Sequence, residues 1–218
     1  MSATGTAPAI GAYQYPVNLV LDAKRCLVVG GGTIALRKVE GLLACGAVVT
    51  VVAPLVDDRL RALAGVTVEE RTYRAGEVAG YRLAIAATDS PEVNASVFHD
   101  GEEAGVWVNG ADDPANCSFT LPSLLRRGPL MVTVSTAGRS PALSRWLRQR
   151  LDAEIGPEYG ILLELLSAER DRLKAEGRST EGPGWQKALD SDMLTLIRTG
   201  DVISARQQLH ACLSSSSD

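Results

Sequence analysis

Residues 25–38, RCLVVGGGTIALRK, decide the fold of this chain. Four apolar residues end in glycines and lead into a helical pattern, which predicts a buried strand, a tight turn and a helix start. Gly30 permits the turn, Gly32 lets the backbone approach a pyrophosphate, and Ala35 fills the third small position, where helix and strand pass closely. The amide groups around Thr33 and Ile34 would face the anion. The stretch therefore predicts a phosphate-binding crossover.

The next predicted strand, within residues 48–54, is a continuous apolar run typical of a parallel strand buried on both faces. A dinucleotide site often has an acidic residue for the adenosine ribose roughly 20 residues past the glycines. Ala53 and Pro54 occupy that place here. Asp57 and Asp58 come later and could serve only if the loop folds back. The residues alone therefore leave NAD and NADP as alternatives.

Further strands are predicted at residues 66–69, 83–87 and 106–108, with helices between them. This alternation predicts an α/β fold with a Rossmann-like, doubly wound parallel sheet, in which ligands bind beyond the carboxyl ends of the strands. One crevice should thus collect the following candidate residues: Gly30, Gly32, Ala53, Pro54, Thr88, Asp89, Asn109 and Asp112.

Asp112 is a candidate general base, because a carboxylate at that edge could take a proton from a bound substrate. The alternative is that Asp112 or Asp113 only caps the turn before Pro114, as aspartates in loops commonly do. The sequence has His99 and His210 as its only histidines. We therefore expect neither a histidine triad nor a histidine metal cluster, and no metal site.

The pattern changes after Asp112. A strand over residues 118–122, a short helix ending at Arg127 and a strand over residues 130–136 predict a small separate layer. Ser140 as N-cap and Pro141 as the first helical residue predict a helix to about Ile155. Its apolar edge of Leu143, Leu147 and Leu151, beside Trp146, could form a dimer surface or a core face. Further helices are expected over residues 159–175, 185–198 and 200–213.

Ser135 and Thr136 close the last predicted strand, beside Gly138. They could hydrogen-bond a carboxylate ligand, or they could be ordinary strand-end residues. Arg139 is one of the arginines that are the only charged residues between Pro114 and Leu151. Such a cationic stretch suits a small polyanion or a self-complementary interface, although a solvated helix face is the alternative. These residues therefore suit the dehydrogenation of a carboxylate-rich molecule.

The composition bounds the class of protein. A chain of 218 residues with 45% hydrophobic residues can form one domain of ordinary size and a smaller one. The net charge of −4 argues against nucleic-acid binding. No apolar run approaches the roughly 20 residues that cross a bilayer, and the first twelve residues lack the pattern of a leader, so we expect a soluble, cytoplasmic protein without membrane association. The scattered cysteines suggest reduced thiols.

Several ordered motifs resemble the siroheme synthase family, and within it the NAD-dependent precorrin-2 dehydrogenase module. The resemblance extends over roughly residues 15–155 and rests on these segments: residues 28–32 with 35–38, residues 51–54, residues 86–89 with Asn94, residues 108–109 with Asp112, and residues 135–141. Ala53-Pro54 is the family's own sequence where other dinucleotide folds keep an acid.

The resemblance implies a Rossmann NAD-binding domain at residues 15–115, a small α+β dimerisation domain at 116–155 and a helical domain at 156–213. Residues 1–14 and 214–218 are expected to be disordered. It further implies an intertwined homodimer that binds precorrin-2 between these parts and passes a hydride to NAD as sirohydrochlorin forms. Asp112 would be the general base.

The resemblance also implies that Ser135 and Thr136 lie near the tetrapyrrole. A macrocycle with eight carboxylates would explain the arginines between Pro114 and Leu151. Some members also insert iron or cobalt as ferrochelatases. Three departures bear on this chain. Gly110 replaces a bulkier apolar residue, Ser118 stands where an aspartate is frequent, and Thr120-Leu121 lacks a nearby histidine, which bears most on metal insertion. A non-catalytic regulator that binds nucleotide or tetrapyrrole is the alternative function.

Overall fold

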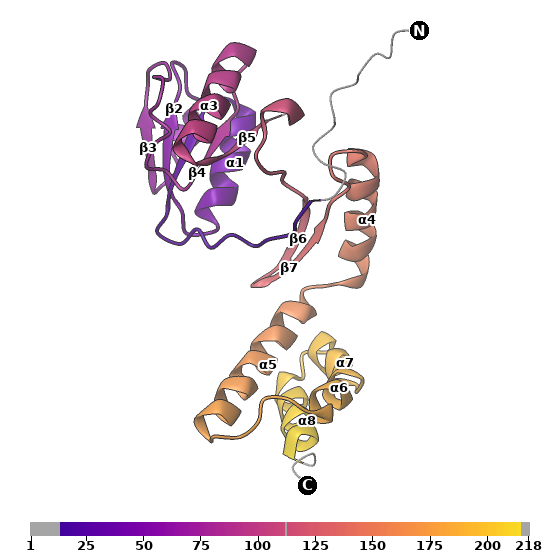
Figure 1. Ribbon diagram of the computed structural model, residues 1–218. Helices are drawn as coiled ribbons and strands as arrows, with labels where there is room; N and C mark the ends of the chain where they lie inside the picture. The colour runs from indigo at the N-terminus through magenta and orange to yellow at the C-terminus, as the bar shows by residue number, and fades with distance from the viewer. Residues whose placement is uncertain (1–13, 112, 215–218) are drawn as a thin grey trace. The chain divides into compact units, whose positions relative to one another are not determined.

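The computed structural model describes residues 14–111 and 113–214 (Figure 1). The segments expected to be disordered, residues 1–14 and 214–218, lie almost wholly outside the described ranges. Asp112 also lies outside them. The chain divides into two compact units. The first extends to Leu121 and includes Ala137–Arg139, and the second comprises Pro122–Thr136 and continues from Ser140.

The first unit is built on one five-stranded sheet with the order β3-β2-β1-β4-β5. All of its neighbouring strands are parallel, which confirms the predicted doubly wound fold. The strands are β1 (Arg25–Val29), β2 (Val48–Val52), β3 (Val66–Glu69), β4 (Leu83–Ala86) and β5 (Trp107–Gly110).

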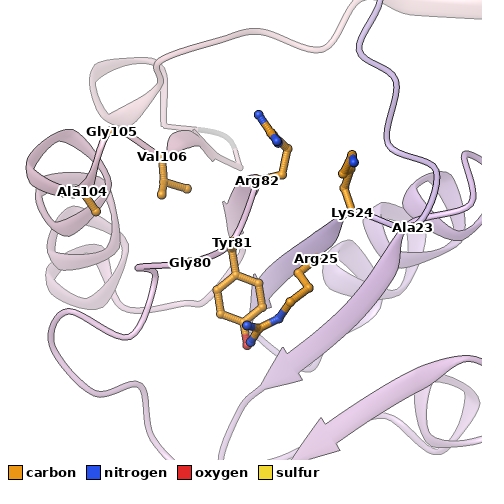
Figure 2. Close-up of a pocket in the computed structure, with 9 residues that line it drawn as sticks. All are labelled: Ala23, Lys24, Arg25, Gly80, Tyr81, Arg82, Ala104, Gly105 and Val106. Carbon is orange, nitrogen blue, oxygen red and sulfur yellow. The ribbon is translucent and has the colours of Figure 1, made fainter.

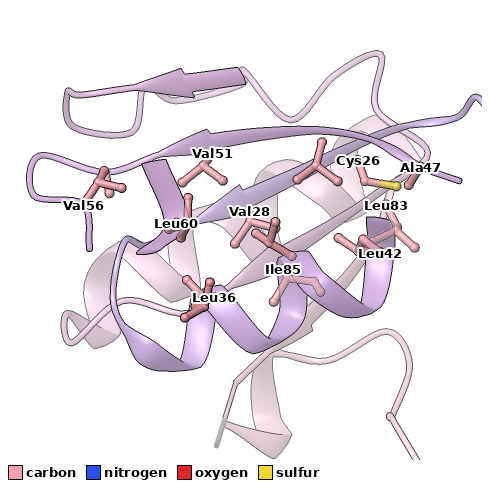
Figure 3. Close-up of a cluster of buried hydrophobic side chains, with 14 of the residues drawn as sticks. Cys26, Val28, Leu36, Leu42, Ala47, Val51, Val56, Leu60, Leu83 and Ile85 are labelled. Carbon is pink, nitrogen blue, oxygen red and sulfur yellow. The ribbon is translucent and has the colours of Figure 1, made fainter. Parts of the chain in front are cut away.

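Helices cover both faces of this sheet. Helix α1 (Thr33–Leu43) and the short α2 (Asp58–Arg61) pack on one face, where Leu36 and Leu60 meet Val28 (Figure 3). Helix α3 (Pro91–Ala104) buries Val97 in a second cluster that includes Leu27 and Val108. Because side chains alternate along a strand, neighbouring residues of β1 enter the two different clusters.

The second unit contains a two-stranded antiparallel sheet, β6 (Ser123–Arg127) and β7 (Leu130–Val134), with α4 (Pro141–Glu154) packed against both strands. The predicted helix ending at Arg127 is therefore wrong, because this segment is β6. Leucine and arginine are good helix formers, but helix propensity amounts to only a few tenths of a kcal/mol per residue, and pairing with β7 across the turn at Gly128 outweighs it. The strand predicted at residues 118–122 is also absent from the described structure, where only Cys117 forms a bridge, to Asn109.

The remaining helices are α5 (Glu158–Ala175), α6 (Pro183–Leu189), α7 (Met193–Arg198) and α8 (Val202–Ser214), and they share one apolar cluster. The single helix predicted at residues 185–198 is two helices, α6 and α7. Ser191 separates them, because its hydroxyl donates to the carbonyl of Ala188 and accepts from the amide of Met193. Within the described ranges, no helix combines the length and the apolar character needed to span a membrane.

The four cysteines form no disulfide among the described residues, and Cys26 is fully buried in β1. Burial raises the pKa of the Cys26 thiol from 9.0 to about 11, partly offset by a backbone hydrogen bond at Leu83. The unfolded chain therefore loses this proton at lower pH than the native protein does, and stability falls as pH rises through that window.

We expect the free energy of unfolding to fall by up to about 2 kcal/mol between pH 9 and 11 because of this one thiol. Denaturant unfolding of the native protein and of Cys26→Ala at several pH values measures the difference. The variant starts less stable because it contains a cavity, but its pH dependence should be flatter. Parallel curves would contradict this assignment.

Candidate functional site

The carboxyl ends of four strands lie in line. Val29 is paired with Val52 and with Ala86, and Ala86 is paired with Gly110. Hydrogen bonds continue this alignment into the loops, because the amide of Gly30 donates to the carbonyl of Val52 at 2.9 Å. The predicted cofactor residues after β1, β2 and β4 are thus collected at one edge of the sheet.

The three glycines of the turn have different surroundings. Gly30 has a φ of +128°, and a Cβ there would lie 2.2 Å from the carbonyl oxygen of Ala87. A Cβ on Gly31 would lie 2.0 Å from the carbonyl oxygen of Leu55. Gly32, in contrast, has nothing within 4 Å of that position. The protein's own backbone therefore requires Gly30 and Gly31, whereas Gly32 leaves open space for a ligand.

Helix α1 begins at Thr33 with no side-chain cap on its amide groups and no acidic residue in its first turn. Thr33 and Ile34 are exposed, while Ala35 is buried against the sheet as its small size predicted. Free amide groups at a helix start carry partial positive charge and bind phosphate. The start of α1 and the space beside Gly32 therefore fit the pyrophosphate of a dinucleotide.

The loop after β2 folds back onto the glycine turn, which is the condition under which Asp57 could lie at the site. The amide of Asp57 donates to the carbonyl of Gly31 at 2.8 Å. The Asp57 carboxylate, however, accepts the Arg59 amide at 2.9 Å, its Nε at 3.0 Å and its Nη2 at 2.6 Å. These bonds from Arg59 lower the pKa of Asp57 to about 2. Ala53 is buried and Pro54 is exposed beside them.

Thr88 is fixed by Asn94, a buried residue of α3. The Thr88 hydroxyl donates to Asn94 Oδ1 at 2.8 Å, and Asn94 Nδ2 donates to the Thr88 carbonyl at 3.0 Å. Asp89, next in the chain, is exposed. Asn94 therefore holds Thr88 in the turn after β4, and the Thr88 hydroxyl is already hydrogen-bonded within the protein.

Asn109 is the last side chain of β5 and is buried. Its Nδ2 donates to the carbonyl of Phe119 at 2.9 Å, so the amide holds the following segment against the sheet. A Cβ on Gly110 would lie 2.8 Å from the carbonyl oxygen of Asn116, which explains why a bulkier residue is missing there. Asp113 Oδ2 accepts from Asn116 Nδ2 at 2.6 Å. Asp113 thus bonds to a side chain within the turn, and which of the two aspartates serves a bound substrate stays a prediction.

The predicted substrate residues lie between β7 and α4. The Thr136 hydroxyl donates to the carbonyl of Ser140 and accepts from its amide, both at 3.1 Å, which shapes the turn before α4. Ala137 and Gly138 follow with positive φ angles of 52° and 75°. Substrate contacts of Ser135, Thr136, Gly138 and Arg139 stay a prediction.

At least three of the arginines in the acid-free stretch have partners inside the protein, among them Arg126, whose Nη2 donates to Met131 Sδ at 3.8 Å. Arg127 pairs with Asp152 at 2.6 Å and donates to the carbonyl of Ile155 at 2.8 Å, so it anchors β6 to the end of α4. The Arg150 guanidinium lies 5.1 Å from the centre of the Trp146 ring. These three arginines thus contribute to the second unit's own structure.

A basic cavity of about 450 Å³ lies at the other edge of the sheet, where β1, β4 and β5 begin (Figure 2). Lys24 and Arg82 point to the same side, and Arg25 lies 4.5 Å from the Tyr81 ring centre. The carbonyl end of α3 at Ala104 also borders this cavity, and a helix C-terminus attracts cations. These cations therefore lie where they complement the carbonyl end of α3.

The parallel sheet, the glycine turn and the uncapped start of α1 define an NAD(P)-binding α/β protein. Comparison with known families agrees, because a model described as putative NAD(P)-binding matches residues 17–123. A second model, described as sirohaem biosynthesis protein central, matches residues 127–154.

The chain is a homologue of siroheme synthases, which confirms the resemblance seen in its sequence. It is 38% identical to a siroheme synthase of Nitrosococcus oceani over 206 residues, 92% of this chain and 44% of that protein. It is 40% identical to a siroheme synthase of Tolumonas auensis over 196 residues, 88% of this chain and 42% of that protein. The chain thus spans less than half the length of these relatives.

Among solved structures, SirC, a precorrin-2 dehydrogenase, is similar with a TM-score of 0.68 and 26% sequence identity. The similarity covers 92% of this chain and 100% of SirC. Unlike the curated siroheme synthases, SirC is therefore matched over its whole length.

Proposed function

We propose that this protein is a precorrin-2 dehydrogenase, which oxidises precorrin-2 to sirohydrochlorin with NAD in siroheme biosynthesis. The observation that carries the proposal is the likeness to SirC, because it extends over all of that chain. The open space beside Gly32 and the uncapped start of α1 support it independently, since they suit a dinucleotide.

The chemistry requires a hydride acceptor and a base. Bound NAD would accept the hydride, and a side chain must take the proton that leaves the macrocycle with it. Asp112 is the proposed base, because it follows the carboxyl edge of β5, and the carboxylate of its neighbour Asp113 is already engaged by Asn116. The proposed cofactor contacts are those of the candidate edge: Gly30, Gly32, Thr33, Ile34, Ala35, Ala53, Pro54, Thr88, Asp89 and Asn109.

Incubation with precorrin-2 and NAD tests the proposal, with NADP in a parallel reaction. We expect NADH absorbance to rise as sirohydrochlorin forms. Tight binding of dinucleotide and tetrapyrrole without turnover would instead support the non-catalytic regulator. Addition of iron or cobalt to sirohydrochlorin tests ferrochelatase activity, and a rate equal to the uncatalysed one would leave a dehydrogenase only.

The domain boundaries at residues 115 and 155 belong to this proposal, and so does action in the cytoplasm, where thiols such as those found here stay reduced. We also propose a homodimer. Helix α4 has no buried residue, and its Leu143 and Trp146 are 47% and 51% exposed. An apolar pair on a helix within the region matched by the sirohaem model suits contact with a second copy.

We expect the double variant Leu143→Glu/Trp146→Glu to be monomeric, because two carboxylates on this surface would be desolvated in a dimer. Sedimentation equilibrium of the native protein and the variant measures the change. Arg145→Gln changes the charge at an exposed position of the same helix that is not three or four residues from Leu143 or Trp146, and this variant should remain dimeric. A monomeric native protein, or a dimeric double variant, would contradict this surface.

A further inference from the structure

Arg59 lies beside the start of α1 although it belongs to α2. Its Nη2 is 3.5 Å from Thr33 Oγ1, and Thr33 is the first residue of α1. The side chain reaches this place because the loop after β2 folds back on Gly31, and because Asp57 holds the guanidinium through Nε and Nη2. A cation is thus fixed next to the amide groups that suit a pyrophosphate.

The two charges of the Asp57–Arg59 pair differ in what they still offer a ligand. Asp57 accepts three hydrogen bonds, all from Arg59, and its side chain is 23% exposed. The Arg59 side chain is 64% exposed, and its Nη1 donates to no described residue. Glu40 of α1 is a further acid that acts on Arg59. The group that this loop presents is therefore mainly a donor and a cation.

The place of the ribose carboxylate supports the same conclusion. A carboxylate at the end of the second strand binds the ribose hydroxyls of NAD, whereas an arginine nearby accommodates the 2′-phosphate of NADP. Ala53 and Pro54 carry no charge, and Asp57 is paired with Arg59. The next acid, Asp58, is 95% exposed and is paired with Arg61. Each carboxylate that follows the second strand in this loop therefore has an arginine partner.

We propose that Arg59, positioned by Asp57 at the first turn of α1, binds a phosphate group of the dinucleotide. Of the proposed function, this inference requires only that the protein binds a dinucleotide. Two phosphates have the same chemistry, the pyrophosphate common to both cofactors and the 2′-phosphate of NADP, and binding measurements with both cofactors distinguish them.

The test is titration of NADH and NADPH into the native protein and the Arg59→Ala variant, followed by nucleotide fluorescence. We expect the Kd to rise about tenfold, the effect of losing one charge-assisted hydrogen bond. A rise for both cofactors identifies the pyrophosphate, and a rise for NADPH alone identifies the 2′-phosphate. Arg59→Lys should lie between, because it keeps the charge and loses the fork.

Arg61→Ala is the matched control. Arg61 is on the same short helix, is also paired with acids, Asp58 and Glu70, and is 40% exposed. Its loss should change either Kd less than about twofold, since Arg61, unlike Arg59, has no hydrogen bond to Thr33 among the described residues. Equal effects of Arg59→Ala and Arg61→Ala, or no effect of Arg59→Ala, overturn the inference.

Removal of Arg59 alone leaves the Asp57 carboxylate unpaired, and this charge would itself repel phosphate. The double variant Asp57→Asn/Arg59→Ala separates the two causes. A persistent loss of affinity supports direct binding by Arg59, and recovery of native affinity overturns it. A native protein that binds neither cofactor contradicts both this inference and the proposed function, whereas one that binds them without oxidising precorrin-2 contradicts only the proposed function.

Discussion

The Asp112→Ala variant is expected to lose precorrin-2 oxidation while it still binds NADH. A positioned general base contributes about 10²- to 10⁴-fold to a rate, and no histidine occurs between residues 100 and 209 to replace it. Turnover is measured as NADH formation in the presence of precorrin-2, and cofactor binding by NADH fluorescence. An unchanged kcat would remove Asp112 from the mechanism.

Asp113→Ala is the matched control for this experiment. It removes a carboxylate one residue away, whose structural partner is Asn116. We expect lower stability with the rate per folded molecule kept, because the turn at Pro114–Asn116 loses a hydrogen bond of about 1 kcal/mol. A reversed pattern, with Asp113→Ala inactive and Asp112→Ala active, would assign the base to Asp113.

The second large effect is expected at neighbouring glycines, where one methyl group has opposite consequences. Gly31→Ala should destabilise the protein by about 3 kcal/mol, because its Cβ would lie 2.0 Å from the backbone oxygen of Leu55, and backbone cannot move aside as a side chain can. Gly32→Ala should cost no more than about 1 kcal/mol, since nothing lies within 4 Å of its Cβ position.

Cofactor affinity should show the reverse order for the folded variants. A methyl group on Gly32 fills the space in which the pyrophosphate is proposed to lie, so we expect the Kd for NADH to rise about tenfold or more. Thermal unfolding and NADH titration of both variants measure the two effects. Native affinity in Gly32→Ala would place the pyrophosphate elsewhere.

Local pattern was sufficient for the parallel sheet of the first unit. The apolar run of residues 26–29, the glycines and the next apolar run at residues 48–52 each specify one element, and parallel strands joined by helices allow few arrangements. The roles of Gly30 and Ala35 followed from the same pattern, because a tight turn and a close helix require small residues at fixed spacing. The family resemblance depended on these segments as well.

Residues far apart in the sequence decided what the pattern left open. The residues of Ser123–Arg127 favour a helix locally, and pairing with β7 made the segment a strand instead. The role of Gly31 depended on Leu55, and that of Gly110 on Asn116. From the sequence, Asp57 was predicted to lie at the site only if its loop folds back. A loop packed on a turn leaves no periodic signal, so only the tertiary structure brought Arg59 to Thr33. The sequence by itself thus determined the sheet and the edge at which a dinucleotide can bind, and the tertiary structure decided which side chains are free to bind it there.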